Sequence, residues 1–461
     1  SAYRAGRNGF MSSEQSGMNR WVIVIGAILI QLCLGAIYAW SAFTGALAKP
    51  VAEGGYGFTA SQTQWIFSVG LAVFAIMTVV SGRLTTKYTP RTLALSGGVI
   101  LGLGYILGGL LGKTFPMQLL CIGLIGGAGI GMAYVVPIAV CVKWFPDKKG
   151  LITGLAVAGF GFGATIWVKL AGGFKTILWL VPMPFDGLLK TVSLAGLPGV
   201  QSVFIVYGIA FLVLVVLGSL VMINPPAGYS PPGWKAPVAG TPAASGALNF
   251  NESQMLGTPQ FYMIFLTFAG SAMAGLMVIG CIQLFGIDAL QASKAAADVA
   301  TATATAGTAM AMYAILNGLG RIAWGAISDR IGRKTSIVLM CASQAVMMAV
   351  LFYLGRSNLG LTLAACVIGF NFGGNFALFP AITADFFGNA NVGRNYGYVF
   401  LSYGVAGIVG PYIAGYFKDA AKASGAGVNA WLTPFMIAAA ACAAAAVIAA
   451  LTRPPKQVPG R

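Results

Sequence analysis

The sequence predicts an all-α integral membrane protein with twelve transmembrane helices in two six-helix halves. Of the 461 residues, 58% are hydrophobic and 8% are charged, whereas a soluble globular chain is about 25% charged. Twelve apolar runs are long enough to cross ~30 Å of hydrocarbon. An internal repeat divides these runs into two sets of six.

The twelve runs are too long and too unalternating for the strands of a membrane barrel. We therefore predict helices, in which each segment satisfies its own backbone polar groups. In chain order the runs are 21–47, 62–81, 91–112, 115–142, 150–171, 200–223, 259–286, 302–327, 335–354, 359–384, 394–416 and 429–452.

The internal repeat is clearest in two loops. "GRLTTKYTPRT" begins at Gly82, after the second run, and "GAISDRIGRKT" begins at Gly325, after the eighth. The two loops align at an offset of 243 residues, as Gly82 and Gly325 show. The same offset carries Gly126, Pro137, Gly154, Gly161 and Gly172 onto Gly369, Pro380, Gly397, Gly404 and Gly415. Such a register indicates two halves in parallel orientation.

The repeat and the composition together predict five segments. The stretch 224–249 is rich in Pro, Gly and Ala, which predicts a linker that lets the two halves move as separate bodies. The connection 172–199 is long and apolar, which suggests an interfacial loop or an external gate. The segments are a tail 1–20, a first half 21–223, a linker 224–258, a second half 259–452 and a tail 453–461.

The formal net charge of +17 reflects membrane orientation rather than a nucleic acid partner. With the N-terminus inside, the inner segments hold 17 of the 27 Lys and Arg residues and the outer segments hold nine, and Arg321 is the remaining one. This positive-inside bias predicts that both termini are cytoplasmic. The inner basic residues are also attracted to anionic lipid headgroups.

The two halves and their paired Gly-rich basic loops resemble the major facilitator superfamily, and "SDRIGRK" at 328–334 is close to its signature. Three further segments are similar to the oxalate:formate antiporter family, whose relatives include monocarboxylate transporters. They are "GAIYAWSAF" at 35–43, "NPPAGYSPPGW" at 224–234 and "NYGYVFLSYGVAGIVGP" at 395–411. The resemblance covers nearly the whole chain. It implies the major facilitator fold and secondary transport of small carboxylates.

Arg321 is the one charged residue well inside an apolar run. All ten acidic residues lie in loops or at helix ends, and the chain has no histidine. A charge at the centre of a spanning helix costs ~2.5–3.5 kcal/mol, which packing does not explain. The alternative is a side chain that extends to the inner interface near Asp329. Helical side chains tilt toward their own N-terminus, and here that direction leads to the midplane.

An unpaired cation between two halves predicts an anionic ligand. A guanidinium fits a carboxylate with two parallel hydrogen bonds, and Asn317, one turn earlier, can hold the guanidinium or donate to the ligand. In the resembled family the arginine of the eighth helix binds the substrate carboxylate, which implies this role for Arg321. Animal monocarboxylate transporters have a proton-coupling aspartate where this chain has Asn317, so that mechanism is not implied here.

The resembled oxalate transporter has a lysine in its eleventh helix where this sequence has Tyr403. A single intramembrane cation matches a monoanion, whereas oxalate would keep one charge uncompensated. We therefore predict a small monocarboxylate substrate. The sequence does not separate lactate, formate, acetate and pyruvate.

Four more residues are candidates for the cavity lining. Tyr38 and Tyr134 stand where members of the resembled family line the cavity with aromatic rings, and the alternative is anchoring at the membrane interface. Asn371 and Asn375 share one face of the tenth helix, where they either line the cavity or bond between helices.

The two repeat loops also carry candidates for a state-dependent latch. Asp329, Arg330 and Arg333 lie together at an inner helix end, and Arg83 occupies the first-half loop. Charge pairs at such positions can hold two halves in one state and break in the other.

These features favour secondary transport by alternating access around a midplane site. The cytoplasmic segments are too short for a receptor with a signalling domain. An enzyme is disfavoured because the helices lack histidine, carboxylates and metal-ligand clusters. Because the helices offer no suitable titratable group, exchange of anions, or movement of a proton with the substrate itself, fits better than proton symport through the protein. The alternatives are an oxalate/formate (dicarboxylate) antiporter and a proton-coupled monocarboxylate symporter. We expect no cofactor, no metal and no nucleic acid partner, contact with membrane lipid, and a monomer in the cytoplasmic (inner) membrane.

Overall fold

The computed structural model describes residues 19–53, 55–177, 181–197, 199–226, 229–231, 249–388, 391–425 and 427–455. The tail before Asn19 and most of the expected linker therefore lie outside the described residues. In the first half, the long helices are α2 (Arg20–Leu34) with η1 (Gly35–Trp40), α4 (Ala60–Leu84), α5 (Pro90–Leu111), η3 (Leu119–Gly126) with α7 (Gly127–Trp144), α8 (Lys149–Gly172) and α10 (Gly199–Ser219).

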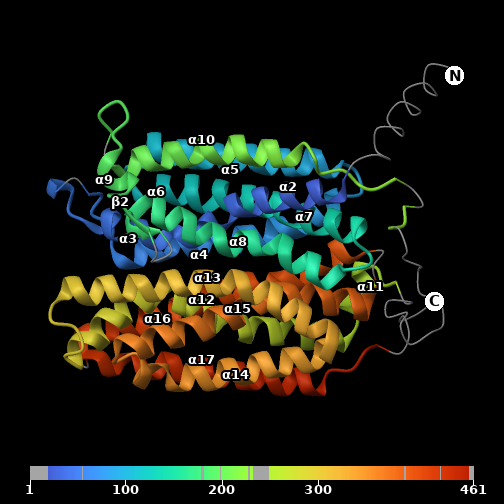
Figure 1. Cartoon of the computed structure of the whole chain (residues 1–461). Helices are drawn as coiled ribbons and strands as arrows, with labels where there is room; N and C mark the ends of the chain where they lie inside the picture. The colour runs from blue at the N-terminus through green and yellow to red at the C-terminus, as the bar shows by residue number, and fades with distance from the viewer. Residues whose placement is uncertain are drawn as a thin grey trace.

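The second half has six long helices, and they lie beside those of the first half (Figure 1). They are α12 (Pro259–Ala292), α13 (Val299–Ile331), α14 (Arg333–Leu354), α15 (Asn358–Phe387), α16 (Val392–Ser424) and α17 (Leu432–Leu451). The short helices are α3 (Ser41–Ala48), η2 (Val51–Glu53), α6 (Phe115–Gln118), α9 (Leu188–Thr191), α11 (Glu252–Leu256) and η4 (Gly427–Trp431). The domain boundaries given above stay a prediction.

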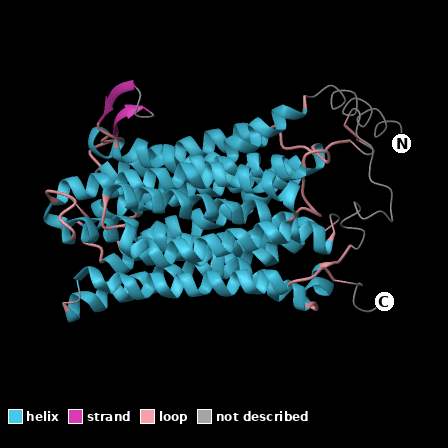
Figure 2. Ribbon diagram, turned by 60° about the horizontal axis from the view of Figure 1, so that its bottom comes forward, coloured by secondary structure: helices cyan, strands magenta, loops and turns pink. Residues whose placement is uncertain are grey.

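The helical membrane fold is confirmed, with one small addition. Strands β1 (Phe174–Ile177) and β2 (Val181–Phe185) pair antiparallel in the long apolar connection. Figure 2 shows this hairpin projecting from one end of the helical bundle. We call that end the hairpin end and the opposite one, which carries α11, the α11 end.

Eleven helices in the described part of the chain are long and apolar enough to cross a membrane. The remaining long helix, α13, falls outside this set, and it is the helix that carries Asn317 and Arg321. It packs between α8 and α15, and both polar side chains are buried. Protein rather than lipid therefore surrounds the polar part of α13.

Several helices begin at cap residues that the sequence provides. Thr258 caps α12 and is followed by proline at the first helical position. Asp298 caps α13 by accepting a hydrogen bond of 2.6 Å from the Thr301 backbone N–H. Caps of this kind satisfy backbone donors that have no partner within the helix. With these caps, α12 and α13 begin within a few residues of the starts of the predicted apolar runs.

The first membrane helix changes geometry halfway. After Leu34 the backbone tightens into the 3₁₀ segment η1, which contains Tyr38 and Trp40. A 3₁₀ stretch within a long helix often marks a functional hinge. The change turns Tyr38 toward the interface between the halves, where it contacts side chains of the second half.

Repeated glycines bring the two halves into close contact toward the α11 end. A Cβ atom on Gly154 of α8 would lie 2.6 Å from the Arg321 carbonyl oxygen, and one on Gly161 would lie 2.7 Å from the Gly318 Cα. The repeat equivalents on α16 face α4 in the same way. A Cβ on Gly397 would lie 3.1 Å from the Val79 Cα. The halves are therefore sealed by two related helix pairs, α8–α13 and α4–α16.

Candidate functional site

Arg321 lies fully buried at the seam between the halves. Its Nε donates to the Asn317 Oδ1 at 3.1 Å, as expected for two residues one turn apart. Its Nη1 donates to the Val157 carbonyl oxygen of α8 at 2.9 Å, so the guanidinium bridges the two halves. The Nη2 has no hydrogen-bond partner among the described residues.

Four aromatic rings enclose the guanidinium, two from each half. The Arg321 Cζ lies 4.0 Å from the ring centroid of Phe376 and 5.2 Å from that of Phe160. Tyr38 packs on Phe160 with centroids 5.1 Å apart, and Tyr403 packs on Phe376 at 5.5 Å. The Tyr38 and Tyr403 hydroxyl oxygens are 2.6 Å apart. We call Arg321 and these four rings the arginine cage.

The charge of Arg321 is not balanced by a nearby carboxylate. In the part of the chain that the structure describes, all four ion pairs involve other basic residues, namely Arg20, Arg333 (twice) and Arg394. Stacking on aromatic faces offsets about 0.5–2 kcal/mol of the burial cost per ring. The buried Nη2 donor remains unsatisfied, and an unsatisfied buried donor costs about 1–3 kcal/mol, more when charged. The Nη2 donor is therefore available to an anion.

Tyr134 of α7 adds a second buried donor beside the cage. Its ring packs on Phe160 and Phe400 with centroid distances of 5.8 and 5.1 Å. Its hydroxyl lies near that of Tyr396, and neither hydroxyl has a hydrogen-bond partner of good geometry among the described residues. The Tyr134 hydroxyl and the Arg321 Nη2 are thus two donors available to a carboxylate.

Substituting Tyr134 with Phe removes one of these donors and keeps the ring packing. We expect the half-saturation concentration for uptake to rise about five- to tenfold, the equivalent of one hydrogen bond of about 1–1.5 kcal/mol. Uptake by reconstituted protein measures it. Tyr105→Phe is the matched control, because Tyr105 is a buried tyrosine that packs on Phe204 and Phe211 within the first half. Equal half-saturation in both variants would remove Tyr134 from the site.

The two asparagines of α15 lie differently from the cage residues. Asn371 donates from Nδ2 to the Ser343 Oγ of α14 at 3.0 Å, so it bonds between helices of the second half. Asn375 donates to the Phe372 carbonyl oxygen within its own helix at 3.1 Å. Among the described residues, neither asparagine forms a hydrogen bond with Arg321. Of the two alternatives above, Asn371 therefore follows the interhelical one.

The charged loop after α13 does not join the two halves in this state. Arg333 pairs with Asp329 at 2.6 Å and with Asp385 at 3.4 Å, and both partners belong to the second half. Arg330 is exposed and forms no ion pair with a described residue. Arg83 does cross the seam, since it donates to the Tyr398 hydroxyl and lies 5.4 Å from that ring. The contact between halves is thus Arg83 with Tyr398, not a carboxylate pair.

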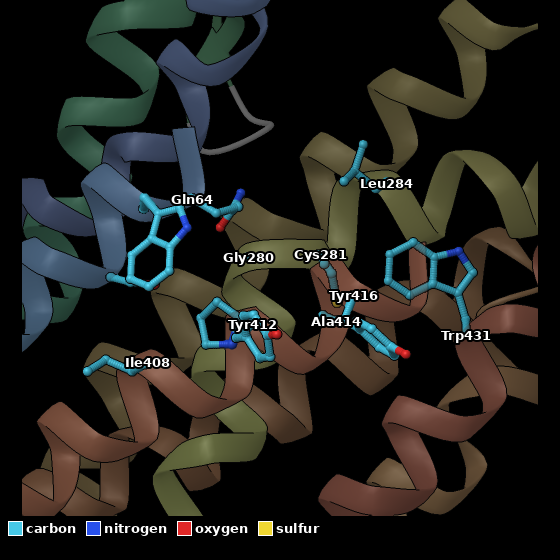
Figure 3. Close-up of a pocket in the computed structure, with 13 residues that line it drawn as sticks. Gln64, Gly280, Cys281, Leu284, Ile408, Tyr412, Ala414, Tyr416 and Trp431 are labelled. Carbon is cyan, nitrogen blue, oxygen red and sulfur yellow. The ribbon is translucent and has the colours of Figure 1, made fainter. Parts of the chain in front are cut away.

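A cavity of about 570 Å³ lies between the halves at the hairpin end, and Tyr38 is one of its lining residues. A smaller cavity of about 210 Å³ adjoins it, and Gln64, Gly280 and Leu284 line both. In Figure 3, Gln64 projects from α4 toward α12 near Gly280. The halves therefore meet tightly at the α11 end and leave space at the hairpin end.

Three groups around Arg321 were not predicted from the sequence, namely Phe160, Phe376 and the Val157 carbonyl. The repeat contains a signal for one of them, because the offset that relates the halves carries Phe160 onto Tyr403. Phe376 has no comparable signal, since one phenylalanine in an apolar run looks like another. A backbone acceptor such as Val157 depends only on how closely the helices approach.

Comparisons with known proteins agree with this architecture. The profile of the Major Facilitator Superfamily matches residues 29–354 and 289–461. The chain is 30% identical over 404 residues to the uncharacterized MFS-type transporter YhjX of Escherichia coli (strain K12), which covers 86% of this chain and 88% of the relative. It is 26% identical over 437 residues to the oxalate:formate antiporter of Oxalobacter formigenes, covering 93% and 92%. It is 25% identical over 458 residues to the apicoplast pyruvate carrier 1 of Toxoplasma gondii, covering 83% and 81%.

The profile match spans most of the chain, and the helices are those of a multi-pass membrane protein. The chain therefore belongs to the major facilitator superfamily, and it is a membrane transporter rather than an enzyme.

Proposed function

We propose that the protein transports small monocarboxylate anions across the cytoplasmic membrane by alternating access, with exchange of one anion for another. The observation that carries this proposal is the buried Arg321, which has an unpartnered Nη2 and no carboxylate partner among the described residues. The relatives named for oxalate, formate and pyruvate support the same substrate class.

In this proposal the carboxylate lies in the arginine cage. One carboxylate oxygen accepts from the Arg321 Nη2, and the Tyr134 hydroxyl donates to the anion from the first half. Asn317 holds the guanidinium plane through Nε. The aromatic rings exclude water, which strengthens the charge-assisted hydrogen bonds. The anion then contacts both halves, as a substrate at the axis of alternating access must.

The described state fits one end of a transport cycle. The seam is closed at the α11 end by the glycine contacts, while the hairpin end holds the cavity above Tyr38. The distribution of basic residues assigns the α11 end to the cytoplasm. On this assignment the state is closed to the cytoplasm, and both termini are cytoplasmic.

Exchange is favoured over proton symport by what the cage contains. Its members are one arginine and four aromatic side chains, and the chain has no histidine. A proton-coupled carrier needs a group near the substrate that gains and loses a proton at working pH. Counterflow in proteoliposomes tests the proposal. We test lactate, formate, acetate and pyruvate in turn, and expect at least one of them, added outside, to drive efflux of the same labelled anion equally with and without a pH gradient. Absence of flux for all four would refute the proposal.

Selectivity provides a separate test, because the cage offers one cation. A second negative charge on the ligand must be desolvated without a partner, at a cost of several kcal/mol. We expect lactate and formate to compete at least about tenfold better than oxalate, since ~1.4 kcal/mol is tenfold in affinity. Tyr403→Lys places an ammonium beside Tyr38 and should narrow or reverse this preference. Stronger competition by oxalate in the unmodified protein would support the alternative, a dicarboxylate exchanger like the oxalate:formate antiporter.

A further inference from the structure

The cavity at the hairpin end has the composition of a binding site. It lies between α4, α8 and η1 of the first half and α12 and α13 of the second, with a volume of about 570 Å³. Typical small-molecule sites measure about 300–1,000 Å³. Tyr38, which also lines the cavity, packs against Phe160 of the arginine cage.

Among the described residues that line this cavity, Lys169 is the one that carries a charge. It lies in the last turn of α8 and is partly exposed. The structure shows no ion pair for Lys169 within the described residues. Asp186 lies nearby along the chain but is exposed and pairs with no basic residue described. The Lys169 ammonium is thus available to an anion that enters the cavity.

Uncharged polar side chains line the same cavity as Lys169. Gln64 projects from α4 and Gln283 from α12, and both line the cavity. Side-chain amides donate hydrogen bonds to a carboxylate without adding opposing charge. Trp40, whose indole N–H donates to the Thr63 carbonyl oxygen at 2.9 Å, provides a fixed apolar wall.

We propose that this cavity is a second, outer binding site for the transported carboxylate, with Lys169 as its cation. The anion binds beside Lys169 first and reaches Arg321 when the hydroxyl contact between Tyr38 and Tyr403 separates. This inference rests on the proposed transport of small carboxylates. Binding at Arg321 does not require the outer site. An experiment can therefore refute the outer site and leave the role of Arg321 intact, or the reverse.

Lys169 also has an ordinary structural role that the test must separate from binding. A cation in the last turn of a helix stabilises the helix through its dipole by about 0.3–1 kcal/mol. Loss of that role would lower the stability of the protein but would not change how an anion affects labelling in the cavity. Lys169→Arg keeps both the charge and the helix interaction, and it serves as the conservative variant.

The decisive experiment uses protein with Arg321→Ala, in which the deep site is absent. Thr308→Cys provides a reporter, since Thr308 is exposed and lines the cavity. Sodium lactate is the probe, and the rate of reaction with a membrane-impermeant thiol reagent is measured above the background of the seven native cysteines. We expect lactate to slow labelling. Lys169→Gln should raise the half-effective lactate concentration about fivefold, the effect of one unit charge at contact distance in water.

Lys190→Gln is the matched control, because Lys190 is an exposed lysine at the same end that does not line the cavity. It should leave protection unchanged, as should Lys169→Arg. The outer site is refuted if lactate gives no protection with Lys169 present, or gives equal protection in Lys169→Gln. The labelling needs no transport, so absence of flux for every monocarboxylate tested on the unmodified protein refutes the proposed function alone.

Discussion

Replacing Arg321 with alanine is expected to reduce lactate uptake about a hundredfold or more. Each hydrogen bond from a charged group contributes about 1.5–3 kcal/mol, and the proposed carboxylate takes its strongest contact from this guanidinium. Arg321→Lys keeps the charge but loses both the fork and the Nε contact to Asn317. We expect a loss of at least about tenfold there, since a point charge does not replace a planar donor pair. Initial uptake rates in proteoliposomes with matched protein content measure both.

The control for this experiment separates binding from folding. Arg356→Lys changes an arginine at the hairpin end whose guanidinium lies 4.5 Å from the ring of Phe352, and it should leave uptake intact. Folded yield after detergent extraction should be similar for all three variants. Uptake by Arg321→Ala at the rate of the unmodified protein would overturn the proposed role of this residue.

Gly161→Leu is expected to stop transport by preventing closure at the α11 end. A Cβ there would lie 2.7 Å from the Gly318 backbone, so the helices must separate to admit the side chain. Overpacking of this kind costs about 1–3 kcal/mol. That cost shifts the balance between the two states by about ten- to a hundredfold. Uptake should fall accordingly, and labelling of Thr308→Cys should slow, because the cavity at the hairpin end closes.

Gly415→Leu is the matched control on the related helix α16. No heavy atom lies within 4 Å of a Cβ at Gly415, so the larger side chain has space. Uptake by this variant should remain within about twofold of normal, as usual for changes that displace nothing. Full uptake by Gly161→Leu would show that the α8–α13 contact is not part of the cycle.

The sequence allowed the helices to be predicted closely because hydrocarbon imposes a simple rule. A spanning segment must be apolar over its full length. Among the long helices described, only α13 departs from this rule. That break was informative, since it directed attention to Arg321 and Asn317, which the structure places in contact. Their role in binding stays a prediction.

The cage itself was only partly predictable. Tyr38 and Tyr403 have polar atoms that set them apart in apolar runs, whereas Phe160 and Phe376 do not. The state-dependent latch stays a prediction, because pairs of this kind hold the halves together in only one of the two states. Asp329 and Arg333 are close in sequence, but Asp385, the second partner of Arg333, lies on another helix of the same half. Charged residues in a loop indicate that ion pairs form there. Which half of the protein supplies the partner depends on the fold.

The hydrogen bond from the Arg321 Nη1 to the Val157 carbonyl has a kinetic consequence for the unloaded carrier. When α8 and α13 part, this bond between the halves is lost, and a charged donor must find another acceptor. Leaving it unsatisfied raises the barrier by about 1–3 kcal/mol, or about five- to a hundredfold in rate. A bound carboxylate supplies the missing acceptor. In the proposed cycle the return of the empty protein is therefore slow and that of the loaded protein is fast, so this one arginine would account for the proposed exchange.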